Sequence, residues 1–243
     1  MNSEKPYFIS QKNKAAGSSA VIVCKPALVV VDMQNYYLKR DSSYVRYFSA
    51  LQPGCLDYII YRCETVVVPN IRLLLCHFRK QGLPVLFLRL CGTDPERNDL
   101  HRFFRETYRK GKRAGFDDVY PLAGDRYADI IDEIKPLPSE RVIDKTTFSP
   151  FTNTAFAMIL NESGISTLVL SGLSTSQCVE STARDASDCG YQIIQIEDAQ
   201  ADYDEMSHNS SLFSSQGVCG GFIISTGDYL KAGLAESACL SST

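Results

Sequence analysis

Residues 168–199 read LVLSGLSTSQCVESTARDASDCGYQIIQIEDA, and this stretch decides the predicted fold. An apolar run at residues 168–170 leads through a turn to a predicted helix that has Cys178 at its start and Gly190 at its end. A second apolar run follows at residues 191–196. Strand, helix and strand in such a short span predict a right-handed βαβ unit. The turn before Cys178 then lies at the carboxyl edge of a parallel sheet, where open α/β folds bind their ligands.

Cys178 has two interpretations at this point. Free cysteines are among the most buried residue types, so one interpretation is a packed core side chain. The other is a nucleophile, because the positive end of a helix lowers the pKa of a thiol and favours the thiolate. The residues that the rest of the chain brings to the same sheet edge decide between the two.

Predicted strands and helices alternate along the whole chain, without repeats or a break in composition. Residues 27–32, ALVVVD, form a continuous β-branched run that is typical of a central parallel strand covered on both faces. Two long segments have no regular pattern, and such excursions are commonly lids or contact surfaces. The chain is therefore predicted to be one α/β domain with a mainly parallel six-stranded sheet. The other predicted strands are residues 83–88, 141–144, 168–170, 192–196 and 221–224; the helices are residues 66–82, 127–134, 155–160, 178–190, 204–214 and a last one from 227; the excursions are residues 36–61 and 91–124.

Composition excludes several classes of function. A formal net charge of −3 over 243 residues gives no electrostatic case for a nucleic-acid or anionic membrane partner. No apolar run reaches the ~18 residues of a transmembrane helix. The nine cysteines form no Cys-x-x-Cys pair and the three histidines are scattered, so no zinc spacing is present and reduced cytosolic thiols are expected. The first residues lack the apolar core of a signal peptide. We predict a cytoplasmic protein with a flexible arm at residues 1–25 and one domain at residues 26–243.

Three polar residues fall at equivalent places, each directly after a predicted strand or its turn: Asp32, Lys145 and Cys178. The carboxyl ends of parallel strands share one edge, so these side chains can converge. A carboxylate can take the proton of a thiol, and an ammonium can stabilise the thiolate and a developing oxyanion. Each residue also has a structural interpretation: a helix cap for Asp32, a surface charge for Lys145 and a core side chain for Cys178.

The blocks around these residues resemble a known family, the isochorismatase-like cysteine hydrolases. Asp-Met-Gln-Asn at 32–35 looks like the opening signature of that family. The segment KTTFSPFTNT at 145–154 resembles its Lys-x-x-Tyr/Phe-Ser-Ala-Phe-x-x-Thr block, with Pro150 in place of the usual alanine. Gly-x-x-Thr-x-x-Cys-Val at 172–179 is similar to its nucleophile block. The likeness spans residues 27–228, and only the two excursions diverge.

This resemblance implies a Rossmann-like three-layer αβα sandwich with strand order 3-2-1-4-5-6 and a catalytic triad of Asp32, Lys145 and Cys178. It also implies a non-proline cis peptide, which carries over to the Ser174–Thr175 bond, and an oxyanion hole for which the N–H groups of Thr175 and Cys178 are the candidates. In the implied mechanism the Cys178 thiolate attacks a carbonyl, Asp32 passes the thiol proton to the leaving amine, and water releases the acid from a thioester. Homo-oligomers are usual in the family.

Two departures narrow the implied reaction. The Asp-x-His…His metal site of the family's nicotinamidases is replaced by RLCGTDP at 89–95, so we expect no metal and no cofactor. True isochorismatases need no thiol, so the presence of Cys178 favours C–N hydrolysis of a small amide or ureide. The alternatives are a hydrolase that releases pyruvate from isochorismate by vinyl ether cleavage and a catalytically idle regulatory member.

The substrate pocket is the least determined part of the prediction. Asn35, Tyr36, Phe148 and Phe151 are neighbours of the predicted triad in the sequence, so each either contacts substrate or packs. Arg89 ends the second predicted strand, where it either binds a substrate carboxylate bidentately or forms a salt bridge at the sheet edge. Arg184, six residues beyond Cys178, is expected to face away from the site in a structural role.

Overall fold

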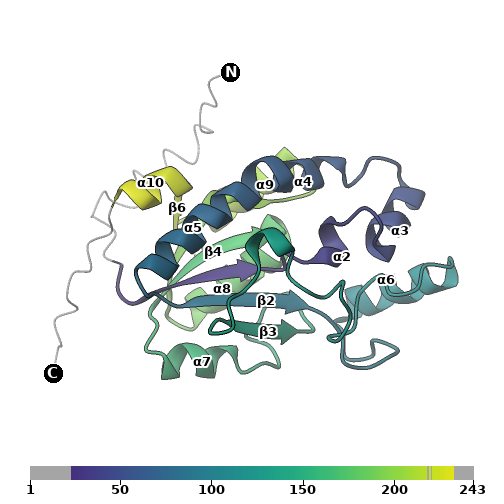
Figure 1. Cartoon of the computed structure of the whole chain (residues 1–243), viewed down its shortest axis with the longest axis horizontal. Helices are drawn as coiled ribbons and strands as arrows, with labels where there is room; N and C mark the ends of the chain where they lie inside the picture. Colours follow the sequence, from purple (N-terminus) through teal and green to yellow (C-terminus); the bar gives the residue numbers. More distant parts are fainter. Residues whose placement is uncertain (1–22, 218, 220, 233–243) are drawn as a thin grey trace, which may run out of the picture.

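A six-stranded parallel sheet forms the centre of the computed structural model, which describes residues 23–217, 219 and 221–232 (Figure 1). The strand order is β3-β2-β1-β4-β5-β6, and every neighbouring pair is parallel. The predicted fold class and strand order are confirmed. Most of the predicted arm at residues 1–25 and the last eleven residues lie outside the described residues. The strands are β1 (Pro26–Val31), β2 (Val85–Leu90), β3 (Arg141–Lys145), β4 (Thr167–Leu173), β5 (Gln192–Ala201) and β6 (Phe222–Ile224).

Helices cover both faces of the sheet, which explains the continuous apolar run of β1. All six residues of β1 are buried, because alternate side chains enter two separate cores. The helical segments are α2 (Asn35–Leu38), α3 (Ser43–Leu51), α4 (Asp57–Arg62), η1 (Cys63–Val67), α5 (Val68–Lys80), α6 (Arg102–Arg113), η2 (Asp132–Ile134), α7 (Phe156–Glu162), η3 (Thr175–Val179), α8 (Glu180–Asp188), α9 (Glu205–Ser215) and α10 (Thr226–Lys231). Leu28 and Val30 face the core under α4, η1, α5 and α10, whereas Val29 and Val31 face the core under α7 and α8.

The predicted helix over residues 127–134 is wrong. Only its end, η2, is helical, and the rest of the segment runs beside the chain that follows β1. Its backbone hydrogen bonds join Ile131 N–H to the Met33 carbonyl and Asn35 N–H to the Asp129 carbonyl, and a bridge pairs Gln34 with Ile130. The apolar side chains of this segment pack against the core, but its backbone pairs with residues 33–36. The segment is therefore not helical, although its apolar residues have the spacing of a helix.

The two predicted excursions contain helices and lie at the carboxyl end of the sheet. The first holds α2, α3 and α4, and the second holds α6. Figure 1 places α2, α3 and α6 together beyond the carboxyl ends of β1 and β2. Both excursions therefore cover the end of the sheet at which Asp32 and Lys145 lie.

Candidate functional site

Asp32 is fixed where β1 ends. Its φ of 50° lies in the left-handed region, which aspartate tolerates better than most residues, and its N–H donates to the Leu88 carbonyl at 3.0 Å. Gln34, fully buried, then ties the chain to the end of β2. Its Nε2 donates to the Leu90 carbonyl at 3.1 Å, and its Oε1 accepts from the Leu90 N–H at 2.8 Å. These bonds hold the carboxylate at the sheet edge.

Cys178 is brought to the same edge by a close approach of β4 to β1. Gly172 pairs with Val31 in the sheet and has a φ of 105°, and a Cβ there would lie 2.1 Å from the Val31 carbonyl oxygen. Only glycine fits such a contact. The chain then leaves β4 and turns into η3, which contains Cys178.

The cis peptide joins Leu173 to Ser174, one bond earlier than predicted from the family motif. The predicted Ser174–Thr175 position is wrong because the chain departs from the strand at Leu173, so the cis bond belongs to the last strand residue and the first turn residue. The Ser174 carbonyl accepts from the N–H groups of Gln177 and Val179, and these bonds close the turn.

Lys145 joins the other two residues of what we call the Asp–Lys–Cys cluster: Asp32, Lys145 and Cys178. Its Nζ lies 2.7 Å from Asp32 Oδ2, 3.3 Å from Cys178 Sγ and 3.1 Å from the Thr147 carbonyl. All three protons of the ammonium thus have acceptors. The three side chains are buried, and Asp32 Oδ1 has no hydrogen-bond partner among the described residues. One carboxylate oxygen is therefore left for a further donor.

Electrostatics leave the thiol protonated. Burial, followed by the negative charge of Asp32, raises the pKa of Cys178 far above its ordinary value, and Lys145 offsets this only in part. Burial also raises the pKa of Asp32, against the lowering effect of Lys145. Burial by itself would lower the pKa of Lys145, but the charges of Asp32 and Cys178 raise it. The expected lowering of the thiol pKa by the helix start is wrong for this buried site, so Cys178 needs a base.

A buried histidine, not among the residues predicted from the sequence, holds the nucleophile turn. His208 of α9 is 4% exposed, and its Nδ1 lies 2.8 Å from Thr175 Oγ1. Its Nε2 lies 3.3 Å from Arg62 Nη2. Because a guanidinium only donates, Nε2 accepts, and Nδ1 carries the proton and donates to Thr175. Burial, and then the charge of Arg62, lowers the pKa of His208 to about 3, which keeps the ring neutral.

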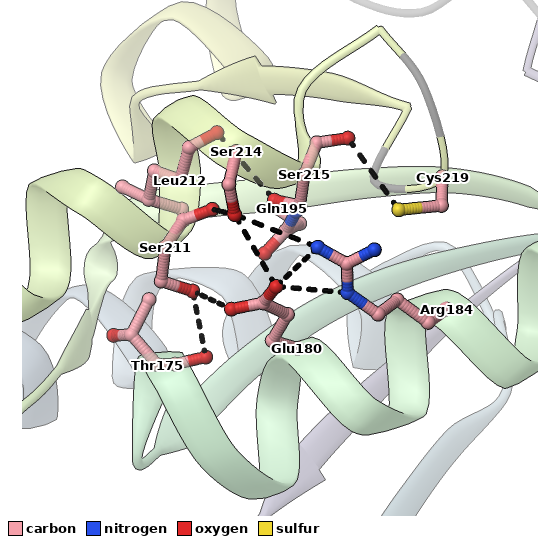
Figure 2. A network of polar contacts seen from close by, with 9 residues as sticks. All are labelled: Thr175, Glu180, Arg184, Gln195, Ser211, Leu212, Ser214, Ser215 and Cys219. Atoms are coloured by element: carbon pink, nitrogen blue, oxygen red, sulfur yellow. Dashed lines mark hydrogen bonds and ion pairs between the residues drawn. The ribbon is translucent and has the colours of Figure 1, made fainter.

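Further contacts from Asp202, which directly follows β5, and from α9 hold the same turn. Asp202, fully buried, accepts from the Ser176 N–H at 2.6 Å. Figure 2 shows Ser211 of α9 between the Thr175 carbonyl and the Glu180 carboxylate, which also binds Arg184. Arg184 thus has the structural role that was expected. Isolated polar residues such as His208 and Ser211 have no sequence signal, because their partners lie on other elements.

Two of the predicted pocket residues lie apart from the Asp–Lys–Cys cluster. Arg89 binds Asp144 through Nε and Nη2 at 2.7 and 2.9 Å and Asp129 through Nη1 at 3.0 Å, so the salt-bridge interpretation describes it. Asn35 donates to the Arg126 carbonyl at 2.9 Å. Both line a surface cavity of about 420 Å³ whose lining includes no residue of the Asp–Lys–Cys cluster.

The predicted aromatic residues divide between the two cores. Phe148 packs against both cores, and its ring lies 4.5 Å from that of Phe104. Tyr36 is buried and its ring lies 5.8 Å from that of Tyr120, a residue of the second excursion that was not predicted. Phe151 instead packs on Phe156 beneath α7, on the other face of the sheet.

Within the described residues, no group of three or more histidine, cysteine, aspartate and glutamate side chains could hold a metal ion. The part of the chain that the structure describes also contains no helix with the length and apolar character to cross a bilayer.

Comparison with known proteins gives a consistent assignment. A family model described as the isochorismatase domain matches residues 26–227. The ureidoacrylate amidohydrolase RutB of Pantoea ananatis is 30% identical over 204 residues, which cover 76% of each protein. The RutB protein of Pseudomonas savastanoi pv. phaseolicola is 31% identical over 182 residues, 71% of this chain and 69% of the relative.

Solved structures agree with these relatives. The N-carbamoylsarcosine amidase of Thermoplasma acidophilum has a TM-score of 0.59 and 29% identity, and the match covers 83% of this chain and 96% of that protein. An isochorismatase family protein of Desulfovibrio vulgaris has a TM-score of 0.69 at 23% identity, which demonstrates the shared fold, with 86% and 97% covered.

Proposed function

The chain belongs to the isochorismatase family of hydrolases, and on this premise we propose that it is a cysteine amidohydrolase that cleaves a C–N bond of a small amide or ureide. The observation that carries the proposal is the contact of Lys145 Nζ with both Asp32 Oδ2 and Cys178 Sγ in a buried site. The names of the amidohydrolase relatives support the C–N bond as the target.

In the proposed reaction, Cys178 Sγ attacks the carbonyl carbon of the substrate as Asp32 accepts the thiol proton. The raised pKa of the thiol makes this base necessary, and the orphaned Asp32 Oδ1 is the oxygen suited to it. The Lys145 ammonium stabilises the negative charge on Cys178 while Asp32 holds the proton, and the charge on Asp32 once it has given that proton up. The N–H groups of Thr175 and Cys178 are the proposed oxyanion donors, held in place by the bonds to Ser174 and His208.

The C–N bond then breaks, and Asp32 gives its proton to the leaving nitrogen. The acyl group stays on Cys178 as a thioester. Water, deprotonated by Asp32, attacks that thioester, the S–C bond breaks, and the acid leaves while the thiol regains a proton. Every step is an acyl substitution or a proton transfer that leaves all oxidation states unchanged, so the reaction needs no redox partner.

A substrate panel tests this function. Amides, ureides and isochorismate are each assayed for both ammonia and pyruvate, with wild type, Asp32→Asn and Cys178→Ala. The proposal expects ammonia from at least one amide or ureide and its loss in both variants, by at least about 10³-fold. Cys189→Ala is the matched control, because that thiol ends the same helical stretch but is exposed. Pyruvate release that survives Cys178→Ala would replace the proposal with the isochorismatase reaction.

The predicted cytoplasmic location and homo-oligomeric state belong to the same proposal. Light scattering of the eluting protein measures the mass of the assembly, and cell fractionation measures its location.

A further inference from the structure

Thr175, the first residue of η3, is held at three points by residues that follow β5. Its Oγ1 lies 2.8 Å from His208 Nδ1, and its carbonyl oxygen lies 3.2 Å from Ser211 Oγ (Figure 2). The N–H of the next residue, Ser176, donates to Asp202 Oδ2 at 2.6 Å. The side chain of Thr175 and both polar groups of the following peptide bond are therefore all in contact with residues 202–211.

The N–H of Thr175 itself takes no part in these contacts. Within the same turn, the N–H groups of Gln177 and Val179 donate to the Ser174 carbonyl. Among the described residues, the Thr175 N–H has no acceptor. A backbone donor that has no partner in the fold is available to a developing oxyanion. The three contacts of Thr175 fix the direction in which this N–H points.

Asp202 is the charged member of the three contacts. The residue is fully buried and directly follows β5. Its Oδ2 accepts from the Ser176 N–H, and its Oδ1 accepts from the Tyr203 N–H at 2.9 Å. No cationic side chain among the described residues forms an ion pair with it. Because each oxygen accepts from an N–H and meets no acceptor for a proton of its own, the ionised carboxylate is the form that fits.

Burial of this carboxylate without a cation destabilises the fold. Two backbone donors replace the water of a buried carboxylate only in part. A neutral side chain at position 202 would avoid that cost. Residues that break a rule of stability in this way concentrate at functional sites, where the gain is in the reaction. The gain is expected at the turn that Asp202 holds.

We propose that Asp202 is a positioning residue of the amidohydrolase reaction. Its carboxylate fixes the peptide bond between Thr175 and Ser176, so that the Thr175 N–H points at the carbonyl oxygen of the substrate. The inference rests on the proposed function. Asp202 acts through Thr175: when Cys178 attacks, the charge that develops on the carbonyl oxygen meets a donor that is already oriented.

Two substitutions of Asp202 test this role. Asp202→Ala removes both acceptors. Asp202→Asn removes at least one, because its amide has a single acceptor oxygen and its NH2 group would face a backbone N–H. The kcat is expected to fall about 10²-fold in the first variant and at least about tenfold in the second, with KM within about twofold of wild type. Ammonia release from the best amide or ureide of the panel measures both constants.

Alkylation of Cys178 separates the oxyanion donor from the nucleophile. When iodoacetamide reacts, the sulfur forms a bond to its CH2 carbon, iodide leaves and Asp32 accepts the thiol proton. No oxyanion forms in this step. The rate of modification is therefore expected to stay within about twofold of wild type in both Asp202 variants. Mass spectrometry of the peptide that contains Cys178 measures that rate.

Asp204→Asn is the matched control. Asp204 lies two residues further along and is exposed, and its carboxylate also accepts a backbone N–H, that of Ser207 at 2.7 Å, as the N-cap of α9. Asparagine caps a helix as well as aspartate does. The kcat, the KM and the alkylation rate of this variant are expected to equal those of wild type.

Three outcomes overturn the positioning role and leave the amidohydrolase function standing. The first is an unchanged kcat in Asp202→Ala. The second is an alkylation rate that falls as far as kcat, because Asp202 would then hold the nucleophile. The third is failure of both Asp202 variants to fold, measured by circular dichroism, because the fold itself would then require the residue. Absence of ammonia from every amide and ureide with wild type overturns the function, and the positioning role with it.

Discussion

His208→Asn and His208→Gln separate the two hydrogen bonds of the buried imidazole. An Asn amide nitrogen reaches the position of Nδ1 and keeps the bond to Thr175, whereas a Gln amide oxygen reaches that of Nε2 and keeps the acceptor for Arg62. Each variant loses one bond, worth about 1 kcal/mol, and leaves a buried partner unsatisfied at about 1–3 kcal/mol. Because Thr175 begins the nucleophile turn, only His208→Gln is expected to lower kcat, by roughly tenfold.

The pH dependence of stability gives the magnitude for His208 itself. Its pKa is lowered from 6.5 to about 3 on folding, so between these values the unfolded chain binds the proton more readily. The stabilisation from the neutral ring is complete above the unfolded pKa of 6.5 and is lost as pH falls toward 3. At about pH 5 the loss of stabilisation is about 2 kcal/mol, because this pH lies about 1.5 units below the unfolded pKa and each unit costs about 1.4 kcal/mol.

Urea unfolding at about pH 7.5 and about pH 5 measures this difference. Carboxylates also titrate in this range, so the quantity compared is the pH-dependent change in the free energy of unfolding of wild type minus that of His208→Asn. The expected value is about 2 kcal/mol. An equal pH dependence in the two proteins would refute the neutral, buried state of His208, and equal kcat in the two variants would refute its role in holding Thr175.

Three further predictions follow from the sheet edge. Gly172→Ala is expected to lower the free energy of unfolding by more than about 3 kcal/mol, because its Cβ would lie 2.1 Å from the Val31 carbonyl oxygen. The control is Gly190→Ala, which also has a positive φ but no atom within 4 Å of the added Cβ, and it should cost only about 1 kcal/mol. Equal losses of stability in urea unfolding would contradict the predicted contact at Gly172. The kcat/KM of wild type should fall as pH drops through the raised pKa of Asp32, with a limb above the ordinary value near 4, and a limb at or below that value would count against Asp32 as the base. In Lys145→Met the limb should move to higher pH, because the charge that lowers the pKa of Asp32 is gone, and an unmoved limb would speak against their coupling.

Much of the fold is predictable from the sequence because the sheet is buried on both faces. The β-branched run of β1 has no polar alternation, and the two cores account for that directly. The carboxyl ends of parallel strands share one edge, so Asp32 and Lys145 could be placed near Cys178 before any distance was known. The contacts of 2.7 and 3.3 Å from Lys145 agree with that placement.

The wrong predictions depend on tertiary contacts, which the sequence of a single segment does not show. Residues 127–131 have helical apolar spacing, but their backbone pairs with residues beyond β1, and such tertiary pairing overrides periodicity. The thiol pKa follows burial and the Asp32 charge more than the helix start, and burial is a property of the whole fold. His208 and Tyr120 cannot be recognised from their own segments, because their contact partners, Thr175 and Tyr36, come from other elements.

The central claim is that Cys178 forms a covalent acyl intermediate with Asp32 as its base. Rapid acid quench during turnover of the best amide or ureide of the panel, followed by mass spectrometry of the peptide that contains Cys178, measures that intermediate directly. The predicted result is the mass of the acyl group on Cys178 in wild type and no adduct in Asp32→Asn. Turnover to ammonia at the wild-type rate by Cys178→Ala, with no adduct on Cys178 in wild type, would contradict it.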